Sequence, residues 1–319
     1  MKKTTRLQEL FQQEQIFVIP GGGCALHAKM VEACGYECAY MSGALTAAHI
    51  LGLPDAGLIT VTEMVQNAGR MANAISLPLI SDSDQGFGNA VNVRRTVQSF
   101  IQAGVAGIHI EDQPFPKRCG FVKGKEIIPL DEAVGKYRAA VEAKRELDPD
   151  FVIIARCDAR TAVGGGLEEA LTRMKAYKQA GVDVVYFEAP QSLEEVKIAR
   201  QEIEGPLMAT VIAIKPSPPL EEMQKLGLSA AFYPALAAFA GMIASWDFLQ
   251  DFQKRGVQAE QELLQRTKGH PLGGLRFFDL VGFPEVREWE EKYLPKEQLT
   301  KYEQSLGLYD PTDKATLGR

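Results

Sequence analysis

Two groups of carboxylates stand where apolar runs of the sequence end, and their chemistry suits a divalent cation. Asp82 and Asp84 follow the run Leu77–Ser81, and Glu111 follows the run Gly107–Ile110. Residues two apart in a strand point to the same side, so Asp82 and Asp84 are expected together. Oxygen-only ligands favour Mg²⁺, with Mn²⁺ as the alternative, and a magnesium site usually keeps several waters.

A cysteine lies shortly after Glu111, at position 119, and four cationic side chains share its stretch of chain. These are Lys117, Arg118, Lys123 and Lys125. Flanking cations depress the pKa of a thiol and favour a thiolate that exchanges a proton. Cys119 is therefore a candidate catalytic acid or base. The cysteines at positions 24, 34, 38 and 157 lack this setting and are expected to be inert small side chains.

An arginine and a further carboxylate follow two later apolar runs. The planar guanidinium of Arg156 suits a substrate carboxylate, and a salt bridge to Glu188 is the alternative; both roles are compatible. For Asp112 and Asp158 the expected role is a helix N-cap or a surface charge. His109 stands between two isoleucines and is expected to be a core residue.

Short apolar runs alternate with helical patterns along most of the chain. This alternation predicts strands whose ends carry the polar residues described above to one edge of the sheet. The expected strands are Ile16–Ile19, Cys38–Ser42, Leu77–Ser81, Gly107–Ile110, Phe151–Ala155, Val182–Phe187, Leu207–Ile212 and Ala230–Tyr233. The expected helices are 25–35, 62–75, 91–103, 131–146, 167–179, 192–203 and 219–226. Eight strand–helix repeats predict an α/β fold, a (β/α)8 barrel with its active site at the carboxyl ends of the strands. A doubly wound open sheet is the alternative.

The glycines at 21–23 and the helical C-terminal part complete the domain prediction. Gly21–Gly23 lacks the spacing of a phosphate-binding loop and is expected to form a tight barrel turn. Residues 1–245 are expected to form the catalytic barrel, and residues 246–319 a helical extension. An extension of this length either covers its own barrel or packs on a neighbouring subunit.

Composition and charge narrow the class of protein. The chain has 319 residues, 46% of them hydrophobic and 24% charged, which is ordinary for a globular protein. A net charge of −6 argues against a general nucleic-acid or anionic-membrane binder. Five scattered cysteines without close pairs favour a reducing cytoplasm, and neither an apolar signal core nor a membrane-spanning run is expected.

Taken together, the motifs resemble those of the isocitrate lyase and phosphoenolpyruvate mutase superfamily, on its 2-methylisocitrate lyase side. The likeness covers residues 6 to 310. No single motif would be specific, but the whole set in this order is highly specific. The pieces are Tyr40–Ala44, Leu51–Asp55, Asp82–Gly88, His109–Gln113, Lys117–Gly120, Ile154–Ala159 and Glu188–Ala189.

The resemblance implies a magnesium-dependent carbon–carbon lyase with a barrel fold, assembled as a homotetramer that swaps a helix between subunits. Its substrate would be a small di- or tricarboxylate cleaved by retro-aldol or retro-Claisen chemistry. Asp82 and Asp84 would hold the metal, Glu111 would act through water, and Asp55 would join that network. Cys119 would be the acid/base on a gating loop. Substrate contacts would come from Ser42, Gly43, Ala44, Gly120, Arg156 and Glu188.

The chain departs from the family pattern at a few positions. Phe121 replaces a histidine, and Thr210 and Ala213 stand where the family has an amide and a carboxylate; Phe121 and Thr210 are kept as substrate-contact candidates. These changes predict a less polar second half of the substrate, such as that of a branched malate. Cys119 favours C–C cleavage over phosphoryl migration. An oxaloacetate decarboxylase or hydrolase type or a phosphonomutase type is the alternative.

Overall fold

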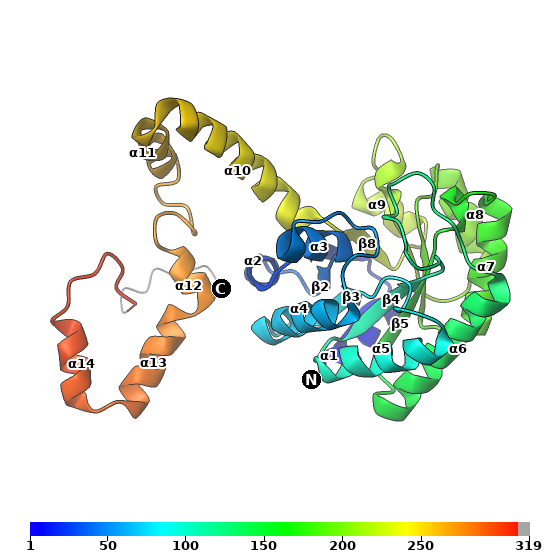
Figure 1. Ribbon diagram of the computed structural model, residues 1–319, viewed down its shortest axis with the longest axis horizontal. Helices are drawn as coiled ribbons and strands as arrows, with labels where there is room; N and C mark the ends of the chain where they lie inside the picture. The colour runs from blue at the N-terminus through cyan, green and yellow to red at the C-terminus, as the bar shows by residue number, and fades with distance from the viewer. Residues whose placement is uncertain (312–319) are drawn as a thin grey trace. The chain divides into compact units, whose positions relative to one another are not determined.

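A closed ring of eight parallel strands forms the core of the unit Met1–Ala238 (Figure 1), which confirms the predicted barrel. The computed structural model describes residues 1–311. The chain divides into two compact units, Met1–Ala238 and Phe239–Arg319. Each strand pairs in parallel with its sequence neighbours, and β1 closes the ring on β8 with Phe17 opposite Ala230. The strands are β1 Phe17–Gly22, β2 Ala39–Met41, β3 Leu79–Asp82, β4 Gly107–Glu111, β5 Val152–Cys157, β6 Val184–Phe187, β7 Leu207–Ala209 and β8 Ala230–Tyr233.

Helices follow the strands and surround the ring, and a hydrophobic layer lies between the two. Those of the barrel unit are α1 Lys3–Gln12, α2 Ala25–Ala33, α3 Gly43–Leu51, α4 Val61–Ala74, α5 Ala90–Gln102, α6 Leu130–Leu147, α7 Leu167–Gln179, α8 Leu193–Glu202 and α9 Leu220–Lys225. Two 3₁₀ turns, η1 Ala159–Thr161 and η2 Val211–Ala213, follow β5 and β7. The strands are continuously apolar in sequence because both of their faces are covered.

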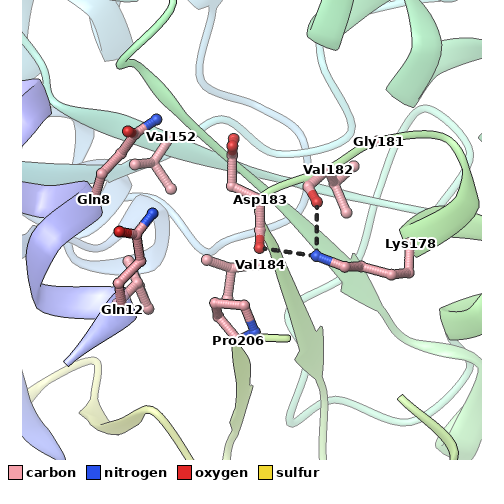
Figure 2. A pocket seen from close by; sticks show the side chains of 10 residues that line it. Gln8, Gln12, Val152, Lys178, Gly181, Val182, Asp183, Val184 and Pro206 are labelled. Carbon is pink, nitrogen blue, oxygen red and sulfur yellow. Dashed lines mark hydrogen bonds between the residues drawn. The ribbon is translucent and has the colours of Figure 1, made fainter. Parts of the chain in front are cut away.

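The barrel interior is filled rather than hollow. Leu7, Leu10 and Phe11 of α1 join the inward-facing residues of the strands in a second buried cluster. A cavity of about 390 Å³ remains beside α1, at the amino-terminal ends of β5, β6 and β7 (Figure 2). There Lys178 Nζ donates to the carbonyls of Val182 and Asp183, each at 3.4 Å. This end of such barrels serves stability, whereas chemistry belongs to the opposite end.

Three local predictions need correction. The seventh strand ends at Ala209 and not at Ile212, because the chain turns into η2 while remaining apolar. Gly21 and Gly22 lie inside β1 instead of a turn; a Cβ on Gly21 would lie 2.1 Å from the carbonyl oxygen of Pro234. Helix α3 was not predicted from the sequence.

The C-terminal unit is helical. α10 Leu236–Arg255 begins in the barrel unit and is followed by α11 Val257–Arg266, α12 Phe277–Val281, α13 Phe283–Tyr293 and α14 Lys296–Glu303. α13 and α14 are separated around Pro295. Large apolar side chains of α10 are exposed, including Trp246 at 67% and Leu249 at 66%. Within residues 1–311, no helix has the length and apolarity needed to cross a membrane.

Candidate active site

The acidic residues predicted as metal ligands come together at the carboxyl ends of β3 and β4. Asp82 is the last residue of β3 and Glu111 the last of β4, and both are almost completely buried. Asp84 lies beyond the strand with a left-handed φ of 46°, and its amide donates to Asp82 Oδ1 at 3.0 Å. Strand alternation was therefore the wrong reason for their proximity; a tight left-handed turn brings the two carboxylates together.

The N-terminus of α3 lies against these carboxylates. Ser42 caps the helix, since its hydroxyl accepts from the Leu45 amide at 3.4 Å. The amide of Gly43 donates to Asp82 Oδ2 at 3.1 Å, and a Cβ here would lie 2.6 Å from that oxygen. Only glycine therefore allows this approach. Ala44 follows in the first helical turn and is half-buried.

A lysine ammonium lies among the acidic side chains. Lys117 Nζ is 2.6 Å from Asp55 Oδ1, 3.1 Å from Asp84 Oδ1 and 3.8 Å from Glu111 Oε1. Burial raises the pKa of Asp84 to about 6, and the neighbouring Asp82 and Asp55 act in the same direction. Burial likewise raises the pKa of Glu111 well above its ordinary value. Three carboxylates therefore lie within 3.8 Å of one ammonium.

Unsatisfied oxygens at this point fit a bound cation. Asp84 Oδ1 and both carboxylate oxygens of Glu111 are buried and accept no hydrogen bond. Buried polar atoms are normally paired, so such oxygens call for a cation or water. Within residues 1–311, no three His, Cys, Asp or Glu side chains converge closely enough to bind a metal directly. The set therefore suits a cation that keeps waters between itself and part of its ligands.

Arg156 is held by Asp158, a buried acid that was expected from the sequence to be a helix cap or a surface charge. Its Nε and Nη2 donate to Asp158 at 2.9 and 3.0 Å, while Glu188 Oε1 lies 3.9 Å from Nη2. Lys125 Nζ donates to the same Asp158 carboxylate at 2.8 Å. Asp158 is completely buried and makes no side-chain cap, so the expected cap or surface role is wrong. Asp158 thus orients the guanidinium of Arg156.

Glu188 has its own buried support. Thr210 Oγ1 donates to Glu188 Oε2 at 2.9 Å, and the hydroxyl of Tyr186 contacts both residues. Thr210 is completely buried. Its hydroxyl therefore orients Glu188, whereas the sequence suggested a direct substrate contact for Thr210, which stays a prediction.

The loop that carries Cys119 lies over these groups. Gly120 is so close to them that a Cβ would be 2.4 Å from Arg156 Nη2 and 2.5 Å from Glu188 Oε1. Lys117 is buried, whereas Arg118 is exposed, which decides which of the two cations enters the site. Phe121 is 56% exposed, and Ala213 is exposed on η2.

The protonation state predicted for Cys119 needs correction. Burial raises the pKa of this thiol, and the carboxylate of Asp55 acts in the same direction. The flanking cations have less effect because Lys117 pairs with carboxylates and Lys125 pairs with Asp158. Cys119 is therefore a protonated thiol near neutral pH, which suits a proton donor.

Other buried groups that sequence reasoning missed support this rim. Asp112 accepts from the Tyr177 hydroxyl at 2.6 Å and from the Asp158 amide at 2.8 Å, and Arg173 lies 3.4 Å away. It is neither a cap nor a surface charge. His109 is a core residue, as predicted, and its Nε2 pairs with the Tyr40 hydroxyl at 2.7 Å. The acidic clusters were visible in the sequence, but their cationic partners lie far away along the chain.

Comparison with known proteins decides the family. The family model described as phosphoenolpyruvate phosphomutase matches residues 7–247. The chain belongs to the phosphoenolpyruvate mutase and isocitrate lyase superfamily. Among its relatives, the 2,3-dimethylmalate lyase of Eubacterium barkeri is 38% identical over 299 residues, covering 92% of this chain and 99% of the relative. The 2-methylisocitrate lyase of Escherichia coli is 41% identical over 224 residues, covering 68% and 73%.

Solved structures of the superfamily have the same fold. A phosphonopyruvate hydrolase in complex with oxalate and Mg²⁺ superposes with a TM-score of 0.80 at 28% sequence identity. The match covers 92% of this chain and 100% of the hydrolase chain. The relatives that are lyases make this superfamily member a carbon–carbon lyase. The superfamily also contains mutases and hydrolases, but the decarboxylase, hydrolase or phosphonomutase alternative is not favoured, because the dimethylmalate lyase matches nearly the whole chain.

Proposed function

We propose that this protein is a magnesium-dependent lyase that cleaves a branched 2-hydroxy dicarboxylate by retro-aldol chemistry. One observation carries the proposal: the loop bearing Cys119 lies directly over the paired Arg156 and Glu188, beside the buried acids of β3 and β4. A proton donor, an anion-binding guanidinium and candidate metal ligands therefore share one pocket rim.

Asp82, Asp84 and Glu111 would hold the cation, with Asp55 at the edge of the same acidic group. The unsatisfied oxygens of Asp84 and Glu111 support this assignment. When bound, Mg²⁺ would supply positive charge that stabilises oxyanions on the substrate. Mn²⁺ has similar ligand preferences and is the expected substitute.

The residues of the chain would bind, orient and protonate. The Nη1 side of Arg156, 3.5 Å from Glu111 Oε2, would bind a substrate carboxylate while Asp158 holds the guanidinium plane fixed. Backbone amides at the start of α3, near Ser42 and Ala44, would bind the second oxyanion. Glu188 would take the proton of the substrate hydroxyl as the bond between the hydroxyl-bearing carbon and its neighbour breaks, and the Cys119 thiol would then protonate the resulting enolate carbon. Gly120 lets the closed loop exclude water that would otherwise quench the enolate.

The proposed substrate class is a branched malate, such as 2,3-dimethylmalate, rather than a tricarboxylate. Thr210 presents its hydroxyl to Glu188, and Phe121 is apolar, so neither adds charge for a third carboxylate. The likeness to the E. barkeri dimethylmalate lyase supports this choice. Phe121 would contact substrate only through movement of the loop, because it is 56% exposed in the closed arrangement.

The proposal includes a homotetramer in the cytoplasm, built by exchange of α10 between subunits. The exposed apolar residues of α10 support a protein partner for this helix. Residues 246–319 would then be the extension that packs on a neighbour. All five cysteines are free, which suits a reducing compartment. Light scattering of the purified protein would measure the assembly.

A substrate panel tests the function. Metal-free protein would receive Mg²⁺ together with branched malates, methylisocitrate, isocitrate, oxaloacetate or phosphonopyruvate, and products would be identified by mass spectrometry. We expect cleavage of branched malates to a 2-oxo acid and a shorter carboxylate, and loss of turnover with a chelator. Equal turnover of tricarboxylates would reject the substrate proposal, and release of phosphate or oxalate alone would reject the lyase chemistry.

A further inference from the structure

The position of Lys117 raises a question that the proposed chemistry does not answer. Its side chain is 1% exposed and its ammonium lies at 2.6 Å from Asp55 and 3.1 Å from Asp84. The group is therefore a buried cation that is ion-paired with acids that should hold a different cation.

The ammonium and a hydrated metal ion need the same space. A magnesium ion keeps its oxygen ligands at about 2.0–2.1 Å and retains several waters. The ammonium nitrogen, 3.1 Å from Asp84 Oδ1 and 3.8 Å from Glu111 Oε1, contacts the same carboxylates that would hold the cation and its waters. Asp84 Oδ1 and both oxygens of Glu111 nevertheless accept no hydrogen bond. Lys117 thus balances part of the acidic charge, and Arg156 Nη1, 3.5 Å from Glu111 Oε2, balances another part.

Lys117 also links the acids to the loop that covers the site. Two contacts hold the backbone at Arg118 and Cys119: a two-way pairing with the Gln113 side chain, at 2.9 and 3.0 Å, and a bond from Cys119 N to the carbonyl of Asp55 at 3.2 Å. The first of these is local, so the ammonium and the Cys119 amide provide the tethers to the chain around Asp55. Moving the ammonium would therefore loosen the loop.

We propose that Lys117 is an internal competitor of the divalent cation: its ammonium occupies Asp84 and Glu111 without metal, and metal binding displaces it and releases the loop. The inference rests on the proposed metal dependence. It implies an order of events in which the metal binds first, the freed loop admits substrate, and the loop then closes again over both. Lys117 is a positioning residue in this scheme, because it acts through the loop and the metal site.

Two measurements test the proposal, and neither depends on turnover. Binding of Mn²⁺ to metal-free protein would be followed by the electron paramagnetic resonance signal of free Mn²⁺ for wild type, Lys117→Met and Lys123→Met. Lys123 is an exposed lysine of the same loop, so its variant loses the same charge outside the site. We expect about tenfold or greater tightening for Lys117→Met, because removing a buried like charge favours the ion, and little change for Lys123→Met.

Amide hydrogen exchange of the wild-type loop gives the second measurement and requires no variant. Peptides covering residues 115–121 should exchange faster once Mg²⁺ is added without substrate, while strand peptides should not change. Unchanged affinity in Lys117→Met overturns the proposal. Tighter binding with an equally protected loop also overturns it, since a charge effect alone would then suffice. Absence of Mn²⁺ binding in all three proteins would instead reject the metal dependence, and the inference with it.

Discussion

The amide of Cys119 donates a hydrogen bond to the carbonyl oxygen of Asp55 across 3.2 Å. This bond joins the loop after β4 to the loop after α3, two segments that are distant in the sequence. It holds the backbone of the cysteine independently of the thiol. Substitution of the side chain therefore leaves the loop backbone in place, which makes the thiol testable by itself.

Replacement of Cys119 by serine should abolish most turnover without unfolding the protein. A hydroxyl is nearly the same size but a far weaker acid, so protonation of the enolate should slow by about 10²- to 10⁴-fold. Product formation measures the loss, and circular dichroism with Mn²⁺ binding serves as the control. Full lyase activity in this variant would contradict the acid role.

The pH dependence of the thiol follows from its surroundings. Burial raises the pKa of Cys119 above the ordinary value of 9.0, so the protonated, active form persists to higher pH. Turnover limited by this acid should stay level up to pH 9.0 and fall only above it. Iodoacetamide should also alkylate Cys119 slowly at neutral pH. Rapid alkylation there would show a thiolate and contradict the assignment.

Gly120→Ala should prevent loop closure. The added Cβ would lie 2.4 Å from Arg156 Nη2 and 2.5 Å from Glu188 Oε1, and both groups are held by buried partners. We expect turnover to fall by about 10²-fold, the cost of misplacing reacting groups, with little change in melting temperature. Gly135→Ala in α6 is the matched control, since its Cβ would meet nothing within 4 Å. Equal turnover in both variants would rule out this closed arrangement.

Variants of Thr210 can show whether its hydroxyl orients Glu188 or contacts the substrate. Valine has the shape of threonine but cannot donate to Glu188, so Thr210→Val should lower kcat by about tenfold, the value of one hydrogen bond to a charged group. Thr210→Ser keeps the hydroxyl and should retain most of kcat. A rise in KM with unchanged kcat would instead show that Thr210 binds substrate directly.

Lys125 should be important for stability. Both it and Asp158 are almost completely buried, and their ion pair is 2.8 Å long. Lys125→Met leaves Asp158 with Arg156 alone and should cost about 3 kcal/mol of unfolding free energy, as for other broken buried pairs. Urea denaturation at neutral pH measures the change. Lys123→Met, which is exposed, should be within about 0.5 kcal/mol of wild type.

The barrel could be predicted because its strands are covered on both faces and therefore read as apolar runs. The same signal misplaced the end of β7, where Val211 and Ile212 remain apolar in a 3₁₀ turn. Helix α3 was missed because Ser42 was taken as the end of a strand and Gly43 as a substrate contact, although Ser42 caps that helix. Local sequence thus located the elements better than their ends.

The acidic members of the site could be predicted, but their partners could not. Asp82 and Glu111 each end a strand, Asp84 follows β3 by two residues, and parallel strands bring such ends together. Lys117 and Lys125 come from a loop, and nothing in the sequence says that this loop folds inward. Asp158 appeared to be a cap for the same reason, since its pairing with Lys125 depends on the path of that loop.

The ring order has a consequence for how the protein acquires its activity. Asp82, Glu111 and Arg156 lie in β3, β4 and β5, and Glu188 and Thr210 directly follow β6 and β7. Each strand supplies about one group, so no fragment shorter than these repeats contains the whole set. Regain of turnover during refolding should therefore lag behind recovery of helical signal, and would report the moment at which neighbouring strands are in register.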